Sequence, residues 1–182
     1  MIALLRAADR IAAPWKNGGG VTREVALSPP NASMDDFDWR ISIAEVRTAG
    51  PFSQFDGVDR TLTILQGRLL LRLDDRSVEL SQDSTPFVFA GDVACDGTPV
   101  DGPVTDLNVM VRRGRFTART ERLTGDSQRT ISTTSVLVAC GPAVIRCGGE
   151  TVSLQRFDAT RFAAPDAHFF TLKGKAVLIE IA

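Results

Sequence analysis

The feature that most constrains the fold is the succession of short apolar runs along the whole chain. Runs of about four to nine residues, rich in Val, Ile, Leu, Phe and Thr, are separated by clusters of Gly, Pro and Asp, which is typical of β-strands. Helical periodicity is not sustained over ten residues, and one short helix is expected near Gly125–Ile131. We therefore predict an all-β fold, a sandwich or a barrel. The expected strands are Ile2–Arg6, Val21–Leu27, Trp39–Arg47, Thr61–Leu65, Leu69–Leu73, Ser77–Leu80, Phe87–Phe89, Val104–Arg113, Phe116–Thr120, Thr133–Cys140, Val144–Cys147, Thr151–Leu154, Arg161–Ala163, Phe169–Leu172 and Ala176–Ile181.

Two turn signals fall between these strands. Gly67 separates Thr61–Leu65 from Leu69–Leu73 and predicts a tight hairpin. The pair Asp74-Asp75 predicts a second hairpin before Ser77–Leu80, because aspartate favours turn conformations.

A weak internal repeat suggests two units. When residues 61–108 are laid on residues 135–182 without gaps, Gly67 falls on Gly141 and Leu80 on Leu154, and the apolar pattern follows. We therefore predict two tandem units, 1–120 and 121–182, with residues 122–134 as the connection. In this alignment Arg60 falls on Thr134 and Asn108 falls on Ala182, so only the first unit is expected to carry a polar site.

Composition narrows the classes of partner. The chain has 182 residues, of which 43% are hydrophobic, and its net charge is −1 from 21 basic and 22 acidic side chains. Nucleic acid is not an expected direct partner, because no basic excess exists to neutralise phosphates. No apolar run approaches the roughly 20 residues that cross a bilayer, and the N-terminus does not resemble a signal peptide. We therefore expect a cytoplasmic protein with no membrane partner.

Cysteine and histidine are too few for the usual metal sites and histidine triads. The three cysteines, Cys95, Cys140 and Cys147, are odd in number and lack CxxC spacing, so small buried side chains are expected rather than disulfides or metal ligands. The single histidine, His168, lies in an apolar stretch and is expected to be packed or edge-facing rather than catalytic. We predict neither a metal nor a cofactor.

The first candidate site segment is the glycine-rich loop Pro14–Gly20. It lacks the GxxxxGK[ST] and GxGxxG spacings, and a strand rather than a helix is expected to follow, so a nucleotide site is disfavoured. We interpret the glycines as bringing Lys16 and Asn17 onto a pocket that Trp15 walls. The alternative is a flexible hairpin without a binding role.

The second segment is Trp39–Val46. Strand alternation puts Arg40, Ser42 and Ala44 on one face. If that face is interior, Arg40 must be paired or must bind an anion, because an uncompensated buried charge is costly. The alternative is an arginine on the solvent face.

Two further segments complete the candidate site. Phe52 is expected to shape the pocket, and Arg60 is suited to a carboxylate because its planar fork can bond both oxygens. Pairing of Arg60 with Asp59 is the alternative. Asp106 and Asn108 share one face of an otherwise apolar strand, where they would either orient Arg60 or touch a ligand.

These segments carry a family resemblance. The stretches PWKNGGGVTREVA, DWRISIAEV, GPFSQFDGVDRTLTILQG and DGPVTDLNVMVRRG resemble the HutD/Ves family over residues 10–115. The resemblance implies a cytosolic bacterial bicupin, made of two RmlC-like cupin units. Catalytic cupins bind a metal through histidines and a glutamate, whereas this stretch has Gln54, Asp56 and Arg60. A site of this kind would repel a divalent metal and attract an anion.

The resemblance also implies a role. HutD members are associated with histidine utilisation, as governors that bind a pathway metabolite, and Ves members with stress or cold responses. Our leading hypothesis is a non-enzymatic regulator that binds a small carboxylate such as urocanate or N-formylglutamate. The residues expected to bind the ligand are Trp15, Lys16, Asn17, Arg40, Phe52, Arg60, Asp106 and Asn108.

Three alternatives remain beside this hypothesis. One is a metal-independent cupin enzyme, an isomerase or hydrolase, with Asp56, Asp106 or Lys16 as acid or base. Another is a Ves-like stress-response protein. A third, compatible with the leading hypothesis, is a module that acts through a regulatory protein partner. A homodimer is also possible in principle, because exposed sheet edges can pair with each other.

Overall fold

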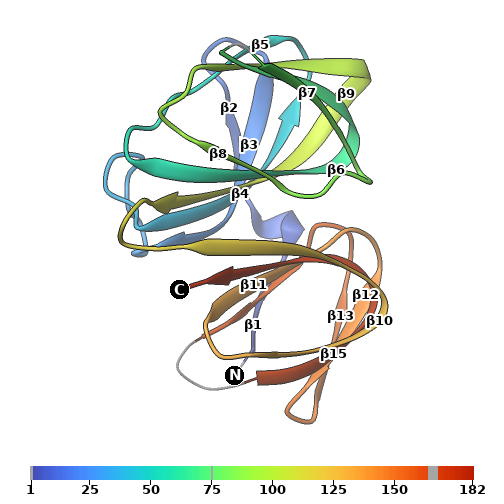
Figure 1. The fold of residues 1–182 in the computed structure, drawn as a ribbon. Helices are drawn as coiled ribbons and strands as arrows, with labels where there is room; N and C mark the ends of the chain where they lie inside the picture. Colours follow the sequence, from blue (N-terminus) through green and yellow to red (C-terminus); the bar gives the residue numbers. More distant parts are fainter. Residues whose placement is uncertain (1, 75, 164–167) are drawn as a thin grey trace. The chain divides into compact units, whose positions relative to one another are not determined.

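The computed structural model describes residues 2–74, 76–163 and 168–182 and divides the chain into two compact units. The N-terminal unit is Ile11–Thr117, and the C-terminal unit is Ala118–Ala182 together with Met1–Arg10. Each unit is built on one antiparallel sheet (Figure 1), and the all-β prediction is confirmed. The predicted units, 1–120 and 121–182, differ from these two units in where they place the start of the chain. There the N-terminal strand, β1 (Ile2–Leu5), pairs with β14 (Ala159–Phe162) and so is grouped with the C-terminal unit.

The sheet of the N-terminal unit has the order β2-β3-β4-β9-β6-β7, with β5 also paired to β9 and β8 to β6. Its longest strands, β6 and β9, pair along most of their length and run side by side in Figure 1. The strands are β2 (Ala12–Pro14), β3 (Gly20–Ser28), β4 (Trp39–Val46), β5 (Gly50–Phe52), β6 (Val58–Leu73), β7 (Arg76–Ser81), β8 (Phe87–Ala90) and β9 (Cys95–Arg112).

The predicted hairpin at Gly67 is wrong, because the two segments on either side of it form the single strand β6. The register with β9 shifts between Ile64 and Gln66 and again between Gln66 and Arg68, so Gly67 lies at a bulge. Gly67 has φ +82°, and a Cβ there would lie 2.9 Å from the carbonyl oxygen of Pro103. The bulge therefore bends the strand where a turn was expected.

The second predicted hairpin is present, because β6 and β7 pair from Arg68 with Ser81 to Leu73 with Arg76. Asp74 has φ +44°, and Asp75 lies outside the described residues. On the interior side of this hairpin, Leu69, Leu71 and Leu80 belong to the core of the unit. The hairpin thus closes one end of the apolar interior.

The sheet of the C-terminal unit has the order β1-β14-β11-β15-β12-β13, with β10 also paired to β15. Its other strands are β10 (Ala118–Ile131), β11 (Thr134–Ala139), β12 (Ala143–Cys147), β13 (Glu150–Leu154) and β15 (His168–Ile181), and the short 3-10 helix η1 (Ala7–Asp9) follows β1. None of the helices among the described residues is long and apolar enough to span a membrane.

Residues 118–131 form a strand instead of the predicted helix at Gly125–Ile131 and the predicted connection at residues 122–134. β10 pairs with β15 without interruption from Ala118 with Ile181 to Ile131 with His168. This long-range pairing satisfies the backbone groups that a helix would otherwise have satisfied locally. Tertiary context therefore decides the conformation of a segment whose sequence is ambiguous.

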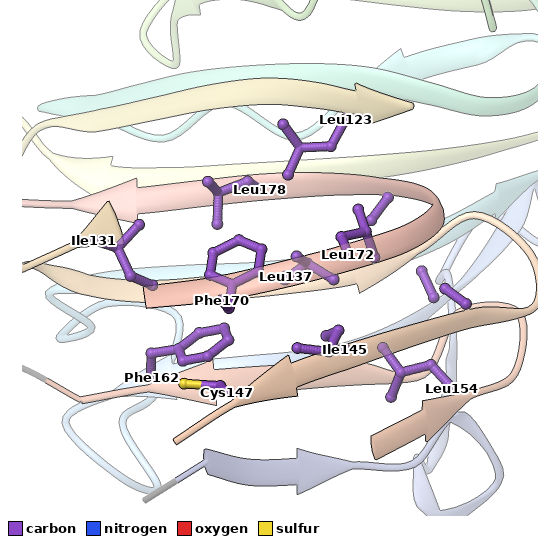
Figure 2. Packing of buried hydrophobic residues seen from close by; sticks show 13 residues of the cluster. Leu123, Ile131, Leu137, Ile145, Cys147, Leu154, Phe162, Phe170, Leu172 and Leu178 are labelled. Carbon is purple, nitrogen blue, oxygen red and sulfur yellow. The ribbon is translucent and has the colours of Figure 1, made fainter. Parts of the chain in front are cut away.

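The interior of the C-terminal unit is filled by apolar side chains (Figure 2). Phe162 and Phe170 stack with ring centroids 5.3 Å apart, and Cys147 lies in the same cluster. His168 packs with its ring 5.7 Å from that of Phe162, and its Nε2 lies 3.1 Å from the Ala163 carbonyl oxygen. The histidine is thus packed, as expected, and all three cysteines are free.

The repeat is visible in the strand pairing. Leu69 pairs with Leu80 in one unit and Ala143 with Leu154 in the other, as the offset of 74 predicts. On the other side of the bulge, the offset of 74 no longer aligns the inward-facing residues of the two units. The register shifts in the bulge of β6 change which side chains of the strand face inward. The buried faces then match Asn108 with Leu178 rather than with Ala182.

Candidate anion-binding cavity

A cavity of about 600 Å³ lies within the N-terminal unit. This volume is in the range of small-molecule sites. All eight residues expected to bind a ligand line it, from β4, β6, β9, the loop before β3 and the end of β5. Its lining residues are Ala13, Pro14, Trp15, Lys16, Asn17, Thr22, Met34, Arg40, Ser42, Ala44, Pro51, Phe52, Ser53, Phe55, Arg60, Asp106, Asn108 and Met110.

Strand register explains why these polar residues meet. Along β9, Asp106, Asn108 and Met110 alternate onto one face, as predicted from the sequence. Their partners on β4 are Ala44, Ser42 and Arg40 respectively, and Arg60 on β6 pairs with Met110. Neighbouring strands lie about 4.8 Å apart, so the side chains of paired residues on β4, β9 and β6 lie next to one another on the cavity wall.

Arg60 is the most buried cation of the cavity, with 5% of its surface exposed. Its Nε and Nη2 each donate to Asn108 Oδ1 at 3.3 Å, and its Nη1 donates to the Ser53 carbonyl oxygen at 3.1 Å. The guanidinium carbon lies 5.0 to 5.9 Å from the ring centroids of Phe89, Phe55 and Phe52. Within the described part of the chain, Arg60 forms no ion pair.

Burial lowers the pKa of Arg60, while the Cys95 thiol and the Asp106 carboxyl act in the opposite direction. An arginine remains protonated at neutral pH in proteins. Its partners within hydrogen-bonding distance are neutral, so the positive charge is hydrogen-bonded but not neutralised.

Asp106 lines the cavity one position further along β9, with 2% of its surface exposed. Its carboxyl group has no hydrogen bond or ion pair with another residue that the structure describes. Burial raises the pKa of Asp106 to about 7, although the charge of Arg60 opposes the rise. The cavity therefore contains a carboxyl group that changes protonation near neutral pH.

Arg40 takes one of the two arrangements expected for an interior arginine, because it is paired. Its Nε donates to Glu24 Oε2 at 3.1 Å and its Nη1 to Ser42 Oγ at 3.4 Å. Its side chain is 14% exposed, so the ion pair lies where the cavity meets solvent. Arg40 is therefore less available to a ligand than Arg60.

The glycine-rich loop joins β2 to β3 and forms one wall of the cavity. The Trp15 N–H donates to the Gly20 carbonyl oxygen at 2.9 Å, and Trp15 Nε1 donates to Thr22 Oγ1 at 2.8 Å. A Cβ on Gly20 would lie 2.6 Å from the Glu45 carbonyl oxygen and 3.0 Å from the Trp15 ring, so a side chain there would displace the indole. The indole meets Phe52 edge to face, with ring centroids 5.9 Å apart.

The other polar residues of the loop differ in role. Asn17 Oδ1 accepts a hydrogen bond from the Gly19 N–H at 3.0 Å, so this amide fixes the loop as well as lining the cavity. Lys16 lines the cavity with an exposed side chain and has no ion-pair partner among the residues with described positions.

Sequence reasoning missed three contributors: Glu24, the Ser53 carbonyl oxygen and Phe89. Glu24 alternates with Thr22 on β3, so it lies on the same face of the strand, but its side chain is exposed and pairs with Arg40 at the edge of the cavity. Phe89 contacts Arg60 because β8 pairs with β6 at that position, a long-range pairing without a local signal. The alternative partner for Arg60 does not apply, since Asp59 Oδ1 accepts from Arg113 Nε at 2.7 Å.

The donor set of the cavity suits an anion. Neither a histidine nor a cysteine lines it, and the described residues contain no group of three His, Cys, Asp or Glu side chains placed to hold a metal ion. Gln54 and Asp56, which follow β5, do not line the cavity, and Gln54 Nε2 donates to the Asp92 carbonyl oxygen at 2.9 Å. The arrangement offers a buried guanidinium, a polarisable aromatic wall and one unpaired carboxyl group.

Comparison with known proteins places the chain in a family. The sequence model of the family described as HutD matches residues 7–179. The chain belongs to the HutD family. A relative from Pseudomonas putida, described as an uncharacterized 21.2 kDa protein in the hutC 3′ region, is 33% identical over 99% of this chain and 97% of its own length. Protein Ves from Citrobacter koseri is 40% identical over 58% of this chain and 55% of its own length.

Solved structures agree with this assignment. HutD from Pseudomonas fluorescens SBW25, described in a formate condition, superposes with a TM-score of 0.89 at 28% identity, covering 100% of this chain and 98% of that one. A cupin 2 conserved barrel domain protein from Leptotrichia buccalis shares the fold, with a TM-score of 0.61 at 8% identity and coverage of 93% and 92%. The predicted bicupin fold and the HutD/Ves relationship are thus confirmed.

Proposed function

We propose that the N-terminal unit binds a small carboxylate, and that the protein is a non-enzymatic, metabolite-sensing regulator of histidine utilisation. The observation that carries this proposal is Arg60, a buried cation on a cavity wall whose hydrogen-bond partners are all neutral. A buried charge without a carboxylate in contact with it is unfavourable, and a bound anion lowers that cost. Binding of a carboxylate in this cavity should therefore lower the free energy of the protein.

The hydrogen bonds of Arg60 leave room for this ligand. An arginine side chain has five N–H groups, and three of them are used by Asn108 and Ser53. Two donors remain for a carboxylate, which a guanidinium can bind with both oxygens. Phe52 and Phe55 on the cavity wall would exclude water from that contact and so strengthen it.

The link to histidine utilisation rests on family membership. The P. putida relative is named for the hutC 3′ region, and the P. fluorescens structure is named HutD. We infer that the ligand is an acidic intermediate of histidine breakdown, such as urocanate or N-formylglutamate. A regulatory protein partner would then read the occupied state.

The test is isothermal titration calorimetry of the wild-type protein and Arg60→Gln with formate, urocanate and N-formylglutamate. Loss of Arg60 is expected to cost about 2–5 kcal/mol of binding free energy, a roughly 30-fold to several-thousand-fold rise in Kd. Arg68→Gln is the matched control, because Arg68 lies on the same strand with an exposed side chain. Equal affinity of wild type and Arg60→Gln for every acid would refute the proposal.

One observation favours a second candidate, a metal-independent enzyme. Asp106 faces the cavity with a pKa of about 7, the range in which a general acid or base works best at neutral pH. An enzyme would turn over one of these acids steadily, and Asp106→Asn would abolish turnover while the acid still bound. Absence of product from urocanate, formiminoglutamate and N-formylglutamate over hours would leave the binding function.

A further inference from the structure

Asp106 is unlike the other buried polar groups of the cavity, because no residue that the structure describes hydrogen-bonds to its carboxyl group, although the charge of Arg60 acts on it. Asn108 is bonded to Arg60, Arg40 to Glu24, and Trp15 to Thr22. The Asp106 carboxyl group alone lines the cavity, almost fully buried, with no hydrogen bond from the described residues. A buried carboxyl group without a partner is unfavourable, so its retention in a cavity wall points to a ligand group that completes it.

We propose that the ligand carries, besides its carboxylate, a neutral N–H group that hydrogen-bonds to Asp106, as the ring nitrogen of an azole or the nitrogen of an amide would, so that Asp106 does not receive a second carboxylate. This inference rests on the proposed function, and it adds the identity of the second recognition group. The first group is fixed at Arg60, and the second contact lies one position beyond Asn108 along β9.

Strand register separates the two contacts. Asn108, which holds the guanidinium, and Asp106 are two residues apart on one face of β9, a spacing of about 6.8 Å. A ligand that spans both must therefore carry its two polar groups at opposite ends of a short body. The indole of Trp15 lies towards the Asp106 end, since its Nε1 bonds Thr22, which pairs with Ala44, the partner of Asp106. A flat ring at this end would pack against that indole.

Charge decides between the candidates for the second group. A carboxylate beside Asp106 would place two acids together, which is tolerated only while one of them holds a proton. An ammonium group would suit only the ionised form of Asp106. A neutral group that has both an N–H donor and an acceptor, such as an imidazole or an amide, suits both forms, because it can donate to a carboxylate and accept from a protonated carboxyl group.

The other charged groups of the cavity do not replace Asp106 in this role. Arg60 repels a cationic ring and serves the carboxylate end. Glu24, the other acid near the cavity, is already paired with Arg40. Lys16 lines the cavity from the loop before β3, with an exposed side chain, and can only donate.

The experiment compares two flat acids of nearly the same shape. Urocanate carries an imidazole on an acrylate arm, and 3-(2-furyl)acrylate carries the same arm on a ring with oxygen and no N–H. We expect wild-type protein to bind urocanate at least about tenfold tighter, and Asp106→Asn to bring the ratio of the two Kd values close to one. Asp96→Asn is the control, because Asp96 lies on the same strand with an exposed side chain, and it should keep the wild-type ratio.

A second measurement needs no variant. Titration of ¹⁵N-labelled urocanate into the wild-type protein should shift the signal of one ring nitrogen, as a new hydrogen bond requires. If both acids bind wild type equally and Arg60→Gln abolishes both, the carboxylate function stands and the ring-nitrogen contact is overturned. If the ratio survives in Asp106→Asn, the assignment to Asp106 is overturned. If neither acid nor formate binds, the proposed function and this inference fail together.

Discussion

The two units have the same strand pairing around their long central strands, yet their interiors are chemically opposite. In the N-terminal unit, Asp106 and Asn108 of β9 face a cavity. At the matching positions of β15, the C-terminal unit has Ala176 and Leu178, which belong to a filled apolar core. A scaffold of this kind thus tolerates either a packed or a hollow interior, because strand alternation decides which side chains point inward.

The same contrast holds for one buried aspartate in each unit. Asp158 of the C-terminal unit accepts hydrogen bonds from the Ala7 N–H at 2.8 Å, the Gln155 N–H at 3.0 Å and Arg6 Nη1 at 2.7 Å. Asp106 accepts no such bond from the residues that the structure describes. Burial would raise the pKa of Asp158, but these hydrogen bonds outweigh it and lower the pKa below its ordinary value. One carboxylate serves the fold, and the other is left for a ligand.

The largest effect is expected from making the filled interior resemble the hollow one. Leu178→Asn should destabilise the protein by about 3–5 kcal/mol, because it removes buried apolar volume and buries an amide without a partner. Urea unfolding monitored by circular dichroism measures the change. The reciprocal Asn108→Leu should weaken carboxylate binding and cost less stability. Equal losses of stability in the two variants would show that the interiors do not differ as described.

A smaller loss is expected from Asp158→Asn, about 2–3 kcal/mol near pH 7, because an amide replaces a carboxylate that accepts charge-assisted hydrogen bonds. A lowered pKa means that the stabilisation by Asp158 is fully present above the ordinary pKa of about 4, and that it is lost as the pH falls below 4 and through the lower pKa of the folded state. The stability difference between wild type and variant should therefore shrink as the pH falls below about 4. A difference independent of pH would contradict this assignment.

The smallest effect, with the opposite sign, is expected from Asp106→Asn. The pKa of Asp106 in the folded state, about 7, exceeds its ordinary value of 3.8, so the folded state holds the proton more tightly. Stability then falls as the pH rises from about 4 to 7, and the penalty is complete above 7. The variant should be more stable than wild type by roughly 1–3 kcal/mol at pH 8, and about equally stable near pH 4. Thermal unfolding across this range tests it, and a variant less stable than wild type at pH 8 would refute it.

Much of the site was predictable because it obeys local rules. Alternation along single strands was enough to put Asp106, Asn108 and Met110 on one face, and the glycines before β3 indicated a close approach of the backbone. The partners of Arg60 were not predictable in the same way. Ser53 contributes only a backbone oxygen, and Phe89 arrives through the pairing of β8 with β6. Both depend on tertiary structure that no local pattern encodes.

Two of the errors in the fold, the divided β6 and the divided β15, have one physical origin. Gly67 and Gly174 both have positive φ and interrupt apolar runs, so the sequence resembles two strands joined by a turn. In the structure each glycine lies inside one long strand, β6 or β15, at a point where the partner backbone comes close. A glycine in a strand marks a bend as readily as a turn, and only the partner strand distinguishes the two.

The bulge of β6 determines which side chains of this strand face the cavity. Side chains face inward at Leu62 and Ile64 before the bulge and at Leu69 and Leu71 after it, so the spacing changes from even to odd across Gln66 and Gly67. Removing one residue there while the hairpin with β7 kept its register would turn the first half of the strand over. Arg60 would then leave the cavity wall and its neighbours would point inward. The chemistry of the cavity is therefore encoded by the length of this segment as much as by the residues that line it.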